Sequence, residues 1–308
     1  MVRRRCEKLK EEDTMRKWIS MCCLVIALLA VGSIKADAAE APVLALGADL
    51  TEDQKAIVFS EMGITAEQAA SYQTVYITND MEHQYLDEAL GASVVGTRSL
   101  SSVLLIPQES GSGLSVETHN ISYCTISMYR NALLTAGVAD AKVIVAAPSS
   151  ISGTAALIGA VKAYEAYSGE PVTDEALEVA TDELVLTGDL MDELNNLDPD
   201  QVSDMIAYLK QEIAERGLDD PEELENLVRQ VAVEMEISLT DQQVSNIVDL
   251  LLKLGNLDID ANQLISQAKE LYSRLESMGI ELDGEKVGNF ITRFVSSIWD
   301  LIQSFLSE

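Results

Sequence analysis

Residues 15–39 constrain this chain most, because they indicate the compartment in which everything after them must fold. A basic pair follows Met15, residues 18–34 carry no charge, and Ala36-Asp37-Ala38 is an A-x-A cleavage motif. This order is typical of a secretory signal peptide, and the uncharged stretch is short for a membrane span, which needs about 20 apolar residues. We expect residues 15–38 to be a signal peptide, and the protein to be secreted or extracytoplasmic after cleavage near Ala38-Ala39.

Residues 1–14 form an unusual extension in front of such a leader. Lys10-Glu11-Glu12 can be encoded AAG GAG GAG, which contains a ribosome-binding sequence, and two residues then form a spacer before Met15. We interpret Met15 as the start of translation and residues 1–14 as an upstream extension. The alternative is a genuine long basic leader, and the nucleotide sequence distinguishes the two.

The cysteines limit how the exported part can be stabilised. Cys6, Cys22 and Cys23 precede the cleavage motif, so only Cys124 remains after it. One cysteine cannot form an internal disulfide, and the fold must therefore be held by packing. Cys22 and Cys23 lie deep in the apolar run, well before the cleavage motif, so we predict no lipid anchor.

The net charge excludes a nucleic-acid partner. The first 38 residues contain eight Lys or Arg and five Asp or Glu, so 13 basic and 46 acidic residues follow Ala38, a net charge near −33. Such a field repels nucleic acids and anionic lipid headgroups. Solubility is the simplest role of this charge, and binding of divalent cations is the alternative. The partner we expect is an unknown protein or a component of the cell envelope.

Residues 40–170 alternate between strand and helix patterns, which predicts an α/β domain with a mixed sheet. Helix starts are indicated near Thr51, Asn79 and Thr125 or Ser127. Strand patterns lie at 74–78, 103–106, 114–118 and 143–147, and a last helix pattern lies at 153–167. The turn Gly111-Ser112-Gly113 predicts that the second and third of these strands form a hairpin. The continuous apolar run 143–147 predicts a strand that is buried on both faces.

Residues 171–308 show helix patterns alone, which predicts an all-α C-terminal helical bundle. LDPDQVSDMIAYL at 197–209 resembles LTDQQVSNIVDLL at 239–251, and each is followed by an acidic turn and a second amphipathic stretch. We therefore expect two helical hairpins, at 197–236 and 239–278. An amphipathic helix is predicted at 285–306. It is expected to pack in the bundle, and a membrane or partner surface is the alternative.

Three blocks of this sequence resemble a known family. They are 113–122 (GLSVETHNIS), 128–157 (MYRNALLTAGVADAKVIVAAPSSISGTAAL) and the LTDQQVSNIVDLLLKL pattern of the tail. They are similar to the YpuA-like secreted proteins of Gram-positive bacteria, a domain of unknown function (DUF1002). The resemblance covers nearly all of residues 40–275. Because the family has no assigned function, the resemblance implies no catalytic residue.

The candidate ligand site consists of small polar residues that follow two predicted strands. These residues are Thr118, His119, Asn120, Ser152, Gly153 and Thr154. The stretch 149–154 joins a buried strand to a helix, and a helix start can present backbone N–H groups to a ligand. The alternative is plain capping by Ser152 or Thr154, with Gly153 there for close packing. We expect these segments to approach each other and to suit a neutral polar ligand or a peptide.

No catalytic, cofactor or metal site is predicted. His119 and Cys124 form a conceivable base and nucleophile, but the sequence signals no third orienting group, and a buried structural cysteine is the simpler interpretation. Residues 258–262 begin like a calcium loop, but Gln263 and Lys269 replace the required glycine and glutamate, so helix capping by Asp258 or Asp260 is preferred. Asp198-Pro199-Asp200 is interpreted in the same way.

Two classes of function remain. The first is a secreted or envelope-associated protein that binds a partner without catalysis. The alternative is an extracellular hydrolase that acts on the cell wall or another extracellular substrate through carboxylates. A hydrolase of this kind needs two carboxylates about 5–10 Å apart across a deep cleft.

Overall fold

The computed structural model describes residues 41–90, 95–194 and 197–257. The chain divides into two units, 1–40 and 41–308, and all the described residues belong to the second. The predictions for the signal peptide, for the second hairpin beyond residue 257 and for the helix at 285–306 lie outside the described residues. In the described part, no helix is both long and apolar enough to span a bilayer.

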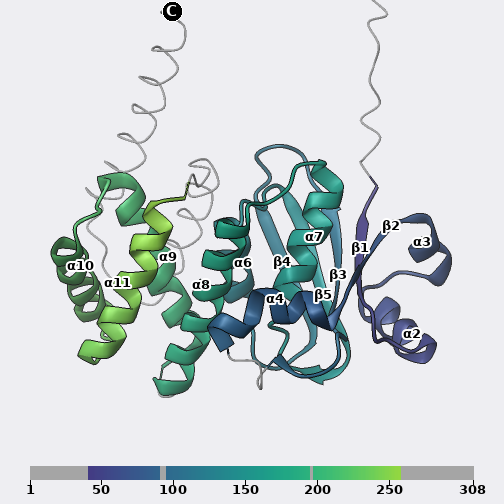
Figure 1. Cartoon of the computed structure of the whole chain (residues 1–308), viewed down its shortest axis with the longest axis horizontal. Helices are drawn as coiled ribbons and strands as arrows, with labels where there is room; N and C mark the ends of the chain where they lie inside the picture. Colours follow the sequence, from purple (N-terminus) through teal and green to yellow (C-terminus); the bar gives the residue numbers. More distant parts are fainter. Residues whose placement is uncertain (1–40, 91–94, 195–196, 258–308) are drawn as a thin grey trace, which may run out of the picture. The chain divides into compact units, whose positions relative to one another are not determined.

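A five-stranded mixed sheet forms the first part of the fold (Figure 1). Its strands are β1 (Val43–Gly47), β2 (Gln73–Ile77), β3 (Ser102–Pro107), β4 (Leu114–Ile121) and β5 (Ala141–Ile151). Their spatial order is β2-β1-β3-β5-β4. The β1–β2 and β4–β5 pairs are parallel, whereas β3 is antiparallel to both β1 and β5. The predicted mixed sheet is therefore confirmed.

The predicted hairpin between β3 and β4 is wrong, because β5 lies between these two strands. The connection from β3 to β4 passes the start of β5, where Asp140 holds it. Asp140 Oδ1 accepts a hydrogen bond from Gly113 N at 2.8 Å, and its carbonyl oxygen accepts one from Gln108 N at 2.7 Å. The continuous apolar run of β5 stabilises the interior position, since its residues 143–147 are buried.

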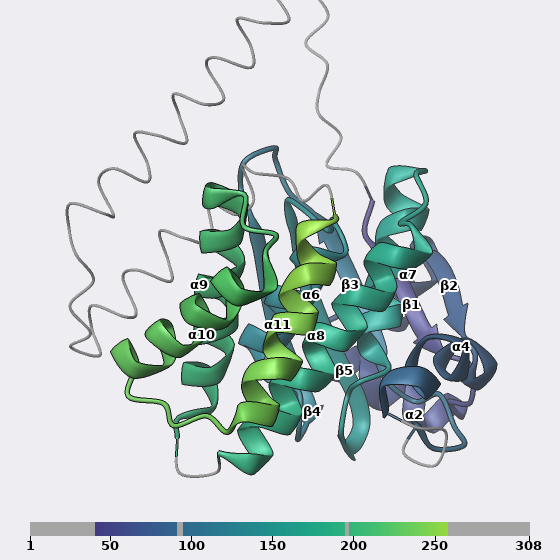
Figure 2. The same ribbon diagram turned by 60° about the vertical axis from the view of Figure 1, so that its left-hand side comes forward.

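Alternate residues of the strands enter two separate cores on the two faces of the sheet. On one face, Val43, Val103 and Val145 pack with α6 (Ile126–Thr135) and α7 (Ala156–Ser168). On the other face, Leu44, Leu104 and Ile144 pack with residues of α2 (Glu52–Glu61) and α3 (Ala66–Ser71). The helices accordingly lie on both sides of the sheet in Figures 1 and 2.

Capping residues start the helices where the sequence predicts them. Thr51 and Thr125 form capping boxes with Gln54 and Met128 at the starts of α2 and α6. The helix predicted from Asn79 is α4 (Asn79–Leu90), although its first-turn amide at Met81 is bound by the Thr78 hydroxyl. Sequence analysis missed β1 and the six-residue α3, whose short patterns give little periodicity.

After α7, the described elements are four helices. They are α8 (Asp174–Glu193), α9 (Pro199–Arg216), α10 (Pro221–Glu234) and α11 (Asp241–Gly255). α8 packs against α6, and α9 contacts α6, α8, α10 and α11. The first repeat thus forms the consecutive helices α9 and α10 (Figure 2). The division of the chain into domains at residue 170 stays a prediction.

The junction of α6, α8 and α9 contains a buried ion pair. Lys210 of α9 and Glu183 of α8 are each 1 % exposed, and Lys210 Nζ lies 2.7 Å from Glu183 Oε1. The same ammonium donates to the Asn131 carbonyl at 2.9 Å and to the Thr135 hydroxyl at 2.8 Å, both on α6. The Thr135 hydroxyl in turn donates to Glu183. The third ammonium proton is donated to Glu183 Oε2 at 2.9 Å, so all three protons have an acceptor, which a buried lysine requires.

Burial lowers the pKa of Lys210, and the attraction of Glu183 opposes that change. A second polar contact joins the same helices, because Asn131 Nδ2 donates to the Ser203 carbonyl of α9 at 2.8 Å. The sheet-bearing part and the later helices are therefore joined by polar groups whose partners are specific, and not by apolar packing alone.

We predict that Lys210→Met lowers the free energy of unfolding by about 3–5 kcal/mol, because it leaves the Glu183 carboxylate buried without its cation. The double variant Lys210→Met/Glu183→Met should lose less than the sum of the two single variants. Urea denaturation of the four proteins measures this coupling.

Lys253→Met is the matched control. Lys253 binds Asp182, the neighbour of Glu183 on α8, at 2.6 Å, but its side chain is 49 % exposed. An exposed pair contributes about 0–1 kcal/mol. Equal losses for Lys210→Met and Lys253→Met would contradict a structural role for the buried pair.

Candidate functional site

The structure places one predicted ligand-binding segment near the end of β4 and the other after β5, and the residues that lie beside Ile151 and Ser152 are Ile121–Cys124. Thr118 and His119 pair with Val145 and Ala146 of β5, and a register shift follows. Asn120 then adopts a left-handed backbone with φ 59° and donates from its side chain to the Ala147 carbonyl at 2.9 Å. Whether these residues bind a ligand stays a prediction.

Gly153 serves close packing. Its φ is 92°, and its carbonyl accepts a hydrogen bond of 2.5 Å from the buried Tyr129 hydroxyl. A Cβ at this position would overlap the Tyr129 hydroxyl oxygen and approach Ile121 Cγ2 to 2.6 Å. Gly153 is therefore enclosed by the protein's own side chains, as the packing alternative expected.

The helix-capping alternative for this segment is wrong. β5 extends to Ile151, so Ser149 and Ser150 belong to the strand and not to the joining loop. Ala155 is the N-cap of α7, and no side chain there makes a capping hydrogen bond. Ser152 is exposed and Thr154 is half-buried.

His119 and Cys124 lie on opposite faces of the sheet. His119 Nδ1 is 3.6 Å from Glu61 Oε2 of α2, whereas Cys124 is buried in the core on the α6 and α7 face. Burial raises the pKa of the Cys124 thiol to about 12, although its hydrogen bond with Tyr129 opposes the rise. A thiol of this kind is a poor nucleophile near neutral pH, and the two residues cannot act as a catalytic pair.

The acidic motif at residue 198 is a helix cap, as predicted. The Asp198 carboxylate accepts a hydrogen bond from Asp200 N at 2.9 Å at the start of α9. The calcium-like loop at 258–262 lies outside the described residues. Within residues 41–90, 95–194 and 197–257, no three His, Cys, Asp or Glu side chains are grouped as a metal site would require.

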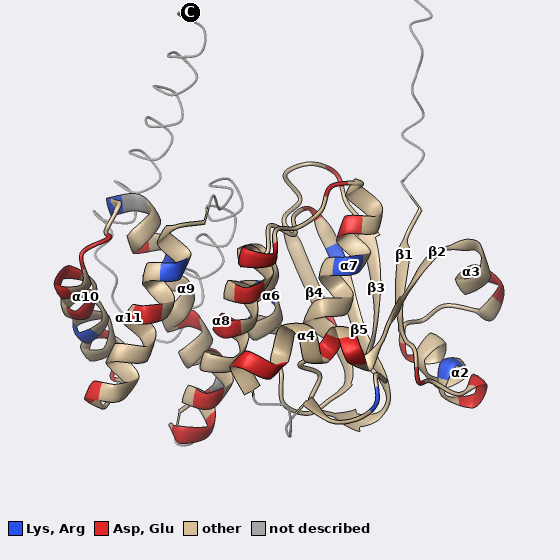
Figure 3. Ribbon diagram, in the orientation of Figure 1, with Lys and Arg blue, Asp and Glu red and all other residues tan. Residues whose placement is uncertain are grey.

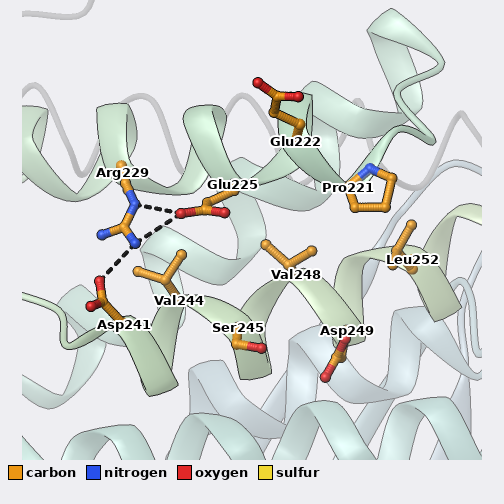
Figure 4. Close-up of a pocket in the computed structure, with 10 residues that line it drawn as sticks. All are labelled: Pro221, Glu222, Glu225, Arg229, Asp241, Val244, Ser245, Val248, Asp249 and Leu252. Carbon is orange, nitrogen blue, oxygen red and sulfur yellow. Dashed lines mark hydrogen bonds and ion pairs between the residues drawn. The ribbon is translucent and has the colours of Figure 1, made fainter.

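Sequence analysis missed a groove between α10 and α11, which has a volume of about 770 Å³ (Figure 4). Its apolar floor consists of Val244, Val248 and Leu252, which are spaced by four residues along α11. Pro221, Glu222 and Glu225 line it from α10. The only sequence signal was the strong amphipathic pattern of 239–251, which does not show which edge of the apolar stripe stays accessible.

One end of this groove is closed by an ion pair across the two helices (Figure 4). Arg229 of α10 lies 2.8 Å from both Glu225 Oε1 and Asp241 Oδ1. The hydrogen bonds that Arg229 donates to Asp241 and Glu225 raise the pKa of its guanidinium. Two of the groove carboxylates are thus engaged by one cation, whereas Glu222 and Asp249 stand on the rim as exposed groups.

Comparison with known proteins places the chain in a family. The family model described as "Protein of unknown function (DUF1002)" matches residues 46–271. The chain belongs to this family. It is 41% identical over 293 residues to "Uncharacterized protein YpuA" of Bacillus subtilis (strain 168), an alignment that covers 93% of this chain and 98% of that protein. No solved structure matches it. The resemblance seen in the sequence is therefore confirmed.

We predict that Gly153→Ala destabilises the protein by about 1–3 kcal/mol more than Gly111→Ala. Both glycines have positive φ, so alanine is strained at both, but a Cβ at Gly111 has no atom within 4 Å. The difference isolates the overlap with Tyr129, and overpacking of this kind costs about 1–3 kcal/mol. Urea denaturation measures it, and equal losses would contradict the packing role of Gly153.

Proposed function

We propose that this protein is exported and acts outside the cytoplasm as a non-enzymatic binding protein of the cell envelope, with the groove between α10 and α11 as its binding surface. The groove itself is the observation that carries the proposal. Its charged rim surrounds an apolar floor, in which Leu252 is half-buried while Val244 and Val248 are 2 % and 8 % exposed. A polar rim around an apolar centre is the composition of a surface that binds part of another macromolecule.

Export is supported by the leader sequence and by the position of the first strand. Cleavage after Ala38 or Ala39 would remove residues that precede β1, which begins at Val43. The sheet would therefore keep all five of its strands in the mature protein.

We also propose that residues 171–308 form one all-α bundle. The apolar core that α8, α9, α10 and α11 share supports this, because Leu190, Met205, Val228 and Ile247 belong to one buried cluster.

The ligand that fits the groove is an amphipathic segment of a polypeptide. Val244, Val248 and Leu252 lie in one line along α11, and Leu252 is the half-buried member while the other two are buried. Apolar side chains that recur every three or four residues on a helical ligand would follow that line and contact Leu252. Glu225 and Asp241 are held by Arg229, and no feature of the described residues favours the hydrolase alternative.

We predict that the secreted protein begins at Ala39 or Glu40. N-terminal sequencing of protein from the culture supernatant tests this. Protein that is found only in the cytoplasm, with Met1 or Met15 retained, would contradict export.

We predict that Ser245→Trp weakens binding of an amphipathic peptide at least tenfold, because the indole would occupy the groove. Ser245 is exposed on α11 and lines the groove, so the protein should fold normally. The probe is a peptide of about 18 residues, long enough for a helix, with Leu along one face and Gln elsewhere. Fluorescence anisotropy measures its affinity.

Gln230→Trp is the control for this experiment. Gln230 is exposed on α10 but does not line the groove. The control variant should bind the peptide as the unmodified protein does. Failure of the unmodified protein to bind, or equal binding by Ser245→Trp, would overturn the assignment of the groove.

A further inference from the structure

A second groove lies on the other side of α11, between that helix and α8. Its volume is about 250 Å³, and its apolar residues are Ala89, Val185, Leu186 and Leu250, of which Val185 and Leu250 are buried. Asp249 lines both grooves. The two grooves are therefore adjacent, and the exposed ridge of α11 separates them.

Acidic side chains dominate both rims. The two grooves together are lined by six carboxylates, namely Asp182, Asp189, Glu222, Glu225, Asp241 and Asp249. Their lining includes two cations, Arg229 and Lys253, which already bind Glu225, Asp241 and Asp182. The acidic residues on α8, α10 and α11 are visible in Figure 3. A net negative charge therefore remains along the whole ridge.

The carboxylates of α8 repel one another. Burial raises the pKa of Asp189, and the neighbouring Glu193 and Asp192 raise it further. An approaching cation would relieve this repulsion, whereas an approaching anion would increase it.

We infer that the partner of this protein is a cationic amphipathic polypeptide that lies across α11 and places apolar side chains in both grooves. This inference rests on the proposed function and adds the charge and the extent of the partner. Complementary charge on the rims would steer and orient the partner. Half-buried Leu252 in the first groove and half-buried Leu186 in the second would supply the apolar contacts, since Val244, Val248, Val185 and Leu250 are buried.

Other occupants match this surface less well. A second copy of this chain would carry the same excess of acidic residues, 51 against 21 basic, and would be repelled. Anionic polymers and anionic lipid headgroups would be repelled for the same reason. A bare metal ion would not use the apolar floors, and the described residues hold no group of three metal-ligating side chains.

The test uses three peptides that share one leucine face and carry Lys, Gln or Glu at the remaining positions. We expect the Lys peptide to bind most tightly and the Glu peptide least. The affinity for the Lys peptide should fall between about 0.01 M and 0.15 M salt, over which the Debye length shrinks from about 30 Å to about 8 Å.

Two variants locate this binding on the ridge. Asp249→Asn should weaken binding of the Lys peptide about three- to tenfold and leave the Gln peptide unchanged, and Asn246→Trp should fill the second groove and weaken the Lys peptide. Asp53→Asn, which removes one exposed carboxylate from α2 on the far side of the sheet, is the matched control and should have no effect.

The outcomes separate this inference from the proposed function. Suppose that Ser245→Trp abolishes peptide binding but that the unmodified protein binds the Lys and Gln peptides equally. The groove is then supported as a binding surface, and the cationic partner is refuted. If no peptide binds, both fail. If the Lys peptide binds equally to the unmodified protein, Ser245→Trp and Asn246→Trp, its attraction is non-specific and the inference is refuted.

Discussion

The buried pair of Lys210 and Glu183 is the interaction on which the arrangement of the later helices depends. It lies where α6, which covers the sheet, meets α8 and α9, and the ammonium contacts groups on both α6 and α8. Apolar surfaces alone tolerate sliding, but buried charges are tolerated only with their partners in place. α9 in turn packs against α10 and α11, which form the groove. The position of the groove relative to the sheet therefore follows from this junction.

Local features of the fold were predictable because they depend on neighbouring residues. Thr51 and Thr125 indicate helix starts because each forms a capping hydrogen bond with a residue three positions later. The apolar run of β5 indicates a buried strand. The pairing of β5 between β3 and β4 was not predictable, because Gly111 and Gly113 fit both a hairpin turn and a longer connection over the end of β5. Strand order depends on contacts between residues far apart in the sequence.

The candidate site, like the fold, was predictable from the sequence only in part. Sequence reasoning predicted that Thr118–Asn120 approach residues 152–154. The structure pairs Thr118 and His119 with Val145 and Ala146, and residues 121–124 lie beside residues 151 and 152 instead. The sequence could not show that the Tyr129 hydroxyl packs against Gly153. It also could not show that His119 and Cys124 lie on opposite faces of the sheet. The groove could not be predicted from the sequence either. Val244, Val248 and Leu252 have the spacing of ordinary core positions, and only the placement of α10 shows that they also line a groove.

The central claim is that a cationic amphipathic polypeptide binds across α11. Hydrogen exchange measured by mass spectrometry tests it most directly, with the mature protein alone and with the Lys peptide. Our account predicts slower exchange in α10, α11 and the facing part of α8, with residues 114–155 unchanged. Protection confined to residues 114–155, or no protection along α11, would contradict it.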